Sequence, residues 1–361
     1  MVNFFGSPDV YRNYLYRSYV YRGYVYRLYV SRCNKQIQFF LVMFFCFFTY
    51  LYSSPVSAQW YEQQAEKMGT LVRVEIWHQD SATAQELIKK VLAEIQRIED
   101  NMSPYIESSM LSQVNRDAAK KRVKIDDELF FVINKSLEYA KQTNGAFDIS
   151  YASVGHLYDY RAGKKPSKEE LKKILPAINF RSVVLDKNNK TIHFLHPDIK
   201  IDLGGIAKGY AVDRCIELLK RHGVTSSVVS AGGDSRLLGD RQGRPWYIGV
   251  KNPRGKGHLM KLPLVNVAVS TSGDYERFFE KDGERYHHII NPKTGTSSKN
   301  IQGVTIIADK AIDSDALSTS VFVLGRQKGL ALIESLPNIS AIVIEETGKV
   351  YYSSDLLQPD L

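Results

Sequence analysis

The sequence has 361 residues, of which 44% are hydrophobic, so it can bury a substantial core and is not a globally disordered chain. Its net charge of +9 is unevenly placed, because residues 1–58 hold six basic side chains against one aspartate. The remainder therefore carries only about +4 and shows no basic face or recognition motif, which argues against nucleic-acid binding.

Residues 1–58 form an unusual leader. Arginine recurs every five residues among tyrosines, at Arg12, Arg17, Arg22, Arg27 and Arg32, which is a low-complexity pattern. One interpretation is a cationic, aromatic arm on a membrane surface. The other, which we favour, is an upstream stretch read through from a misplaced start site.

The second half of the leader has the three parts of a secretory signal peptide. An apolar run over residues 39–52 follows Arg32 and Lys35, and residues 53–58 end in a small-x-small pattern. The run is shorter than the roughly 20 apolar residues of a membrane-spanning helix. We therefore predict export to the periplasm or another extracytoplasmic compartment. The alternative, an uncleaved leader, would associate the protein with the membrane.

Cys33 and Cys46 belong to the leader, which leaves Cys215 as the one cysteine of residues 59–361. That region can therefore form no internal disulfide. Cys215 lies on a predicted helix, and we expect a packed core thiol without a catalytic role.

Strand and helix patterns alternate irregularly over residues 59–361 and indicate one α+β domain with mixed or antiparallel sheets. We expect helices that begin at residues 81 and 314 and others over 127–142 and 207–221. We expect hairpins over 183–195 and 339–353. The remaining expected strands are 71–77, 199–203, 226–230, 246–250, 265–270 and 304–308.

The most informative segment runs from Asp202 to Ala211 and contains Gly204, Gly205 and Lys208. A glycine turn before a helix leaves backbone N–H groups free at the positive end of the helix dipole, which suits an anion. The spacing matches neither the dinucleotide-binding glycine pattern nor the P-loop. A tight turn that merely needs glycine explains the segment equally well on spacing alone.

Three further segments carry weaker signals. Gly232-Gly233-Asp234 and residues 270–275, which include Asp274, are glycine turns with polar side chains. His287 and His288 are adjacent, so on a strand they point to opposite faces and at most one enters a given pocket. No cysteine or further histidine stands at zinc-like spacing. Either histidine would serve as a general base, although a surface histidine is the plainer interpretation.

Asp315 and Thr319 are four residues apart at the beginning of a predicted helix and therefore share one face. A carboxylate and a hydroxyl are hard oxygen ligands of the kind that Mg2+ binds together with phosphate oxygens. Taken by itself, an acidic residue here also simply complements the helix N-terminus.

Together these segments resemble the ApbE family, the FAD:protein FMN transferases once described as thiamine-biosynthesis lipoproteins. Any one segment is common, but eight in order are not. The resemblance runs from Met68 to about Gly325. Its segments are Met68-Gly69-Thr70, Ser103-Pro104-Tyr105, Gly145 to Ile149, Asp202 to Ala211, Gly232-Gly233-Asp234, Ser272 to Tyr275, His288 to Pro292 and Asp315 to Thr319.

The resemblance implies a T-fold-like α+β architecture with a flavin-nucleotide cleft. The residues that match flavin-nucleotide contacts are Met68, Tyr105, Ala146, Phe147, Asp148, Asp202, Lys208, His288 and Ile290. Metal ligation is implied for the carbonyl of Gly205 and the side chains of Asp315 and Thr319. His288, ahead of Asp274, is the implied proton acceptor. Two departures are Asn291, where the family usually has aspartate, and a leader without the lipidation cysteine of many relatives.

The implied activity is Mg2+-dependent transfer of FMN from FAD to a threonine, or serine, hydroxyl of a target flavoprotein, with release of AMP. The expected targets belong to redox-driven membrane complexes that face the same compartment. Two alternatives stay open at this point, namely an FAD pyrophosphatase that uses water as acceptor and a non-catalytic FAD-binding protein.

Overall fold

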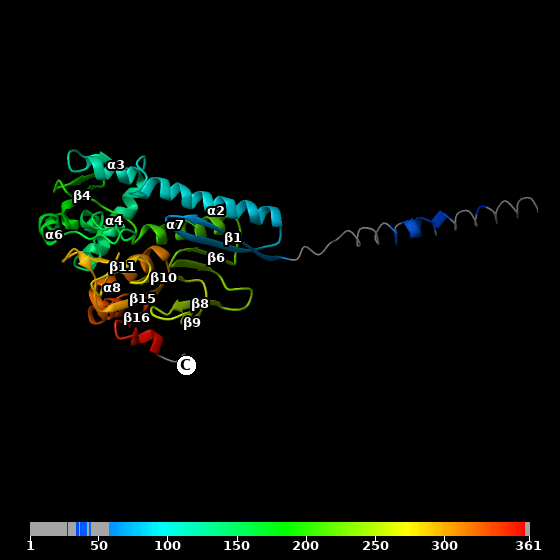
Figure 1. Ribbon diagram of the computed structural model, residues 1–361. Coiled ribbons are helices and arrows are strands. Elements are labelled where there is room, and N and C mark those ends of the chain that lie inside the picture. The colour runs from blue at the N-terminus through cyan, green and yellow to red at the C-terminus, as the bar shows by residue number, and fades with distance from the viewer. Residues whose placement is uncertain (1–26, 28–33, 36, 42, 45–57, 358–361) are drawn as a thin grey trace, which may run out of the picture. The chain divides into compact units, whose positions relative to one another are not determined.

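A computed structural model describes residues 27, 34–35, 37–41, 43–44 and 58–357 (Figure 1). The chain divides into two units, Met1–Ser57 and Ala58–Leu361. Most of the predicted leader, including its small-residue end, lies outside the described residues, so the signal peptide stays a prediction. Among the described residues, no helix combines the length and apolarity needed to cross a membrane.

The unit Ala58–Leu361 is built on an eight-stranded sheet whose neighbouring strands are all antiparallel. Its central strand β15 is buried along its whole length, which explains its continuous apolar run. The strands in spatial order are β1 (Gln59–Lys67), β2 (Thr70–His78), β6 (Ser227–Ala231), β7 (Asp234–Leu238), β10 (Ala268–Gly273), β15 (Ile301–Ala308), β16 (Ser340–Glu345) and β17 (Val350–Tyr352).

Three long helices pack against this sheet and against one another: α2 (Ser81–Met102), α7 (Ala207–Arg221) and α8 (Ala311–Glu334). The side chain of Asp80 caps α2 by accepting a hydrogen bond from the Thr83 amide. Apolar residues at helical spacing, such as Leu87, Val91 and Ile95, face the core. Helix α8 is kinked at Gly325, whose φ is 77°.

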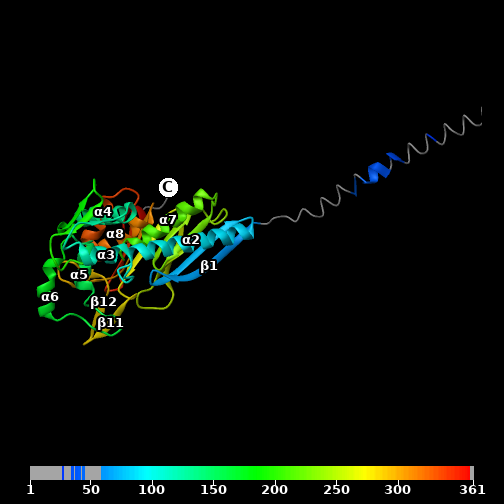
Figure 2. The ribbon, with the colours of Figure 1, turned by 90° about the horizontal axis from the view of Figure 1, so that it is seen from above.

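A second group of elements gathers at one end of the unit, where Figures 1 and 2 both place α3, α4 and α6. It contains a small sheet in the order β3-β5-β4, with the strands β3 (Val123–Lys124), β4 (Val183–Asp186) and β5 (Thr191–Phe194). The helices here are α3 (Met110–Asp117), α4 (Asp127–Gln142), α5 (Ala152–Gly155) and α6 (Lys168–Ile174), with the 3-10 turns η1 (Ile149–Tyr151), η2 (Leu175–Ala177) and η3 (Phe180–Ser182).

Three two-stranded ribbons and a final turn complete the unit. The ribbons are β8 (Trp246–Lys251) with β9 (His258–Leu264), β11 (Phe278–Lys281) with β12 (Glu284–His287), and β13 (Ile290–Asn291) with β14 (Thr296–Ser297). The turn is η4 (Ser354–Leu357). Antiparallel sheets with packed helices confirm the predicted α+β class.

One predicted strand, over residues 199–203, is wrong. Its side chains do alternate, with Ile199, Ile201 and Leu203 buried, but the segment joins no sheet. Side chains satisfy its backbone instead, because Asn115 bonds both the N–H and the carbonyl of Ile201 and Ser153 accepts from the Lys200 amide. The expected ranges also leave out β1, β3, β7, β9 and the strands from β11 to β14, and β10 begins at Ala268 rather than residue 265.

Cys215 confirms the expected core thiol, because its side chain is fully buried on α7. Burial raises the pKa of the Cys215 thiol far above its usual value. In a variant with Cys33 and Cys46 replaced by serine, we expect a thiol reagent to leave the folded protein unmodified and to react with Cys215 once urea unfolds it. Rapid modification of the folded variant would contradict this burial.

Candidate functional site

The glycine turn before α7 meets α8 at close range. A Cβ atom added to Gly205 would lie 3.3 Å from Thr319 Oγ1 and 3.3 Å from the Phe147 ring. A Cβ atom added to Gly209 would lie 2.8 Å from the Cβ atom of Asp315. Glycine at these two positions therefore lets the backbone of α7 approach the face of α8 that carries Asp315 and Thr319.

Asp315 is buried and bonded from two directions. Its Oδ2 accepts from the Gly209 amide at 3.0 Å, and the Lys208 Nζ lies 3.4 Å away. Lys208 also pairs with Asp234 at 2.8 Å, so its ammonium is held between two carboxylates. Burial and the nearby Asp234 raise the pKa of Asp315, and Lys208 opposes them. Burial alone would lower the pKa of Lys208, but the two carboxylates raise it overall.

These residues fit a magnesium ion. The Gly205 carbonyl, the Asp315 carboxylate and the Thr319 hydroxyl are hard oxygen donors from adjoining elements, and Ser272 Oγ lies 3.4 Å from Thr319 Oγ1. In the described part of the chain, no three His, Cys, Asp or Glu side chains form a metal-binding group. Such a donor set is incomplete on its own, which suits Mg2+ because that ion usually keeps waters and phosphate oxygens as ligands.

The rings of the two adjacent histidines make different contacts. His287 ends β12 with both ring nitrogens engaged, since Nε2 lies 2.8 Å from the Ser298 carbonyl and Nδ1 accepts from the Ile289 amide. His288 follows the strand and is partly exposed, and its buried Nδ1 has no partner among the described residues. Burial, followed by the charges of His287 and Arg277, lowers the pKa of His288 to about 3. Its imidazole is therefore neutral at physiological pH.

Asp274 is less suited than His288 to accept a proton. Arg254 binds its carboxylate with both terminal nitrogens, at 2.8 and 2.5 Å, and Arg285 lies 3.6 Å away. A carboxylate held by two guanidinium groups has few free lone pairs left to accept a proton. Arg254 and Arg285 thus hold the Asp274 carboxylate in place directly after β10.

Three of the residues predicted to bind the nucleotide lie in turns or loops, outside the helices and strands. Tyr105 is 86% exposed, so its ring is available for stacking. Asp202 accepts hydrogen bonds from the Tyr151 hydroxyl at 3.1 Å and the Gly204 amide at 2.6 Å. Met68 adopts a positive φ of 53° at the turn between β1 and β2.

Four more of the predicted contacts have buried side chains. Ala146, Phe147, Asp148 and Ile290 are each less than 7% exposed. The Asp148 carboxylate caps η1 through the Ser150 amide and also accepts from the Phe180 amide. Because these four side chains are buried, mainly their backbone groups are left to contact a nucleotide. The four predicted contacts would therefore be made through the main chain.

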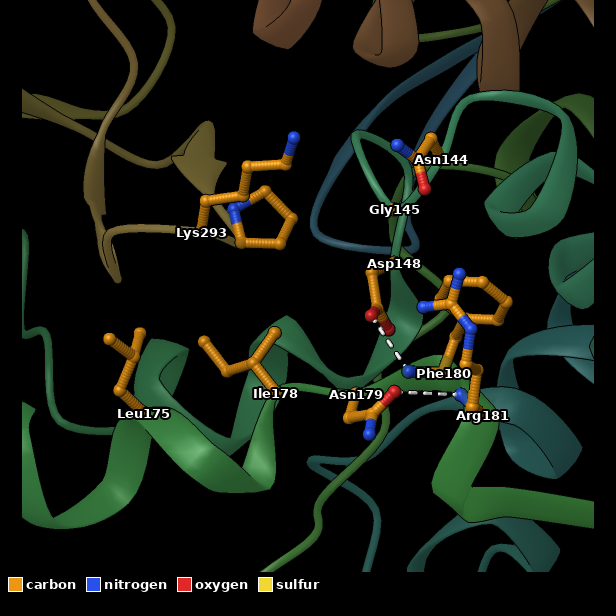
Figure 3. A pocket seen from close by; sticks show the side chains of 10 residues that line it. Asn144, Gly145, Asp148, Leu175, Ile178, Asn179, Phe180, Arg181 and Lys293 are labelled. Carbon is orange, nitrogen blue, oxygen red and sulfur yellow. Dashed lines mark hydrogen bonds between the residues drawn. The ribbon is translucent and has the colours of Figure 1, made fainter.

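Asp148 and Phe180 line a cavity of about 350 Å³ (Figure 3). Its lining also includes Asn144, Arg181 and Lys293. None of Gly205, Asp315 and Thr319 lines it. The cavity is therefore separate from the candidate metal site, and Asp148 is the one predicted site residue that it shares.

The sequence analysis missed three residues at this site. Tyr151 positions Asp202, Asp234 holds Lys208, and Arg277 donates to the Gly69 carbonyl at 3.3 Å. Asp234 belongs to a motif that the sequence revealed, but no function was predicted for it. The spacing of Tyr151 and Arg277 gave no signal that either residue belongs to the site. Only the folded chain brings them to the other site residues.

Fold and site together define an α+β protein with a candidate divalent-metal and anion site where α7 meets α8. The chain belongs to the ApbE family, whose model matches residues 68–343. It is 31% identical over 310 residues to the FAD:protein FMN transferase of Treponema pallidum, covering 80% of this chain and 86% of that protein. It is 30% identical to the FAD:protein FMN transferase of Vibrio cholerae, covering 80% and 89%.

Solved structures agree with this assignment. The ApbE protein of Thermotoga maritima superposes with a TM-score of 0.77 and 34% identity, covering 83% of this chain and 98% of that one. The flavin transferase ApbE of Vibrio cholerae gives a TM-score of 0.74 and 27% identity, covering 83% and 99%. These likenesses confirm the ApbE architecture that the motifs predicted.

Proposed function

We propose that this protein is an FAD:protein FMN transferase that moves FMN from FAD to a threonine or serine hydroxyl of a target flavoprotein and releases AMP. The observation that supports it most is the meeting of Gly205, Asp315 and Thr319 beside Lys208. The names of the relatives supply FAD as donor and a protein as acceptor. The magnesium requirement and the hydroxyl acceptor are part of the proposal.

The residues of the chain divide the work of phosphoryl transfer, which needs mainly alignment and neutralisation of charge. Lys208 and the positive end of the α7 dipole offset the charge that builds on the leaving AMP. Tyr105 orients an aromatic ring of FAD by stacking. His288, neutral and with an unpartnered nitrogen, takes the proton of the attacking hydroxyl. A magnesium ion on Asp315, Thr319 and the Gly205 carbonyl would neutralise the diphosphate.

The roles of the two histidines predict opposite phenotypes. We expect His288→Ala to lower the rate of FMN attachment by about 10²–10⁴-fold without lowering the melting temperature. His287→Ala should lower the melting temperature, because it removes the buried bond to Ser298. Transfer kinetics and thermal melts of both variants test this. Near-normal transfer by His288→Ala would remove the histidine from the mechanism.

The depressed pKa of His288 also has a consequence for stability. Its folded value of about 3 lies below the ordinary value of 6.5, so the unfolded chain binds a proton first as the pH falls. This contribution to stability is therefore complete above about pH 6.5 and is lost between there and about pH 3.

One assay separates the proposal from its alternatives. The protein is incubated with FAD, Mg2+ and a candidate flavoprotein subunit, and the products are examined by in-gel flavin fluorescence and by AMP release. Fluorescence on the subunit together with AMP supports transfer. AMP without labelled protein indicates an FAD pyrophosphatase, and bound FAD without AMP indicates a flavin-binding protein.

The proposed place of action is an extracytoplasmic compartment such as the periplasm, because the leader has the parts of a signal peptide. The proposed acceptor is a flavoprotein subunit that faces this compartment. Mass spectrometry of the N-terminus of the exported protein tests the leader, and an intact leader on membrane-bound protein would favour anchoring over cleavage.

A further inference from the structure

Arg277 connects two parts of the site that the sequence separates widely. It follows β10 and precedes β11, and its guanidinium donates to the carbonyl of Gly69 at 3.3 Å. Its own carbonyl accepts from the His288 amide at 3.1 Å. Arg277 therefore lies between the turn that carries Met68 and the proposed proton acceptor.

Arg277 differs from the neighbouring cations of the site in its ion pairs. No carboxylate forms an ion pair with it in the described part of the chain, whereas Arg254 and Arg285 hold Asp274 and Lys208 holds Asp234. The guanidinium is also exposed. An unpaired, accessible cation beside a phosphoryl-transfer site is suited to bind an anion of the substrate.

The charge of Arg277 affects the pKa of two neighbouring side chains. Burial lowers the pKa of His288 most, and the charges of His287 and Arg277 add to that effect. Although the Tyr105 ring is largely exposed, partial desolvation of its hydroxyl and the charge of Asp202 raise the pKa of Tyr105, and Arg277 opposes them. The guanidinium thus lies within electrostatic reach of both the proposed base and the proposed stacking ring.

We propose that Arg277 binds the non-bridging oxygens of the FMN-side phosphate of FAD, an inference that rests on the proposed function. In the transfer step the acceptor oxygen bonds to that phosphorus and its proton goes to His288. The bond from the phosphorus to the oxygen bridging to AMP breaks, and AMP leaves with the bonding electron pair. Because Lys208 is the cation proposed to offset the charge on the leaving AMP, the two cations would hold the two phosphates separately.

Arginine suits this position because its planar fork donates to two phosphate oxygens at once, which lysine does not do. Arginines that stabilise transferring phosphoryl groups contribute rate factors of about 10³–10⁵ in phosphoryl-transfer enzymes. The Arg277 side chain is exposed, and the Gly69 carbonyl is its one hydrogen-bond partner among the described residues, so substitution should leave the apo protein stable.

Binding of ADP and AMP tests this assignment without any acceptor protein. The second phosphate of ADP stands for the FMN-side phosphate, whereas AMP has only the phosphate of the leaving group. In Arg277→Gln we expect the preference for ADP over AMP to fall about 10- to 100-fold, with AMP affinity and melting temperature unchanged. Arg277→Lys should recover part of the preference. The matched control is Arg161→Gln, an exposed arginine in a loop.

The outcomes separate this inference from the proposed function. An unchanged preference for ADP in Arg277→Gln overturns the inference alone. If Arg277→Gln loses affinity for ADP and AMP equally, or has a lower melting temperature, Arg277 serves to hold the Gly69 turn. Either result also overturns the inference. A wild-type protein that binds neither nucleotide refutes the proposed function, and the inference with it.

Discussion

Replacement of Asp315 by asparagine is expected to reduce FMN attachment by about 10³-fold, because a metal ion supplies several kcal/mol of charge stabilisation in such reactions. The substitution keeps the volume of the side chain while removing the only carboxylate among the proposed ligands. The Gly209 amide still finds an oxygen acceptor, so the fold should persist. Transfer kinetics, together with the rise in melting temperature on adding Mg2+ and ADP, measure the effect.

Asp313→Asn is the matched control for this variant. Asp313 lies two residues before Asp315 on α8 and therefore faces another side of the helix. There it accepts a hydrogen bond from the Tyr139 hydroxyl at 2.5 Å and pairs with Lys135 at 3.3 Å. We expect this control to keep the response to Mg2+ and most of the activity. Near-normal FMN attachment by Asp315→Asn would refute the metal assignment.

Local signals in the sequence predicted much of the fold. The bounds of α4 and α7 agree with the predicted ranges, since charged or capping residues and glycine mark their ends. The same local reasoning placed Asp315 and Thr319 on one helix face. It failed at residues 199–203, because alternating burial is also produced by an extended segment whose backbone bonds to side chains, here those of Asn115 and Ser153.

The site itself depends on contacts between distant segments. That Gly205 meets Thr319, and that Lys208 lies between Asp234 and Asp315, follows from how α7 packs on α8 and the sheet. No periodicity or cap encodes such a pairing. Resemblance to a family supplied the proposed metal ligands in advance. It gave no reason to notice Arg277, which stands out because no carboxylate among the described residues forms an ion pair with it.

The packing of α7 on α8 makes Gly209 the position where a single methyl group should do most damage to the fold. An added Cβ atom would lie 2.1 Å from the Ala311 carbonyl oxygen and 2.8 Å from the Asp315 Cβ atom. Backbone atoms cannot turn aside as a flexible side chain does, so the two helices must separate. We expect Gly209→Ala to lower the free energy of unfolding by about 3 kcal/mol or more, measured by urea denaturation.

Gly223→Ala separates this clash from a simple backbone effect. Gly223 follows the same helix with a φ of 79°, and a Cβ atom added there would meet nothing within 4 Å. Alanine at this position should cost only about 1 kcal/mol of strain from the left-handed conformation. If Gly209→Ala is no less stable than Gly223→Ala, close contact between α7 and α8 does not hold the site together. If Gly209→Ala is less stable than Gly223→Ala but still folds, the rise in its melting temperature on adding Mg2+ should also be smaller, because Asp315 moves with α8.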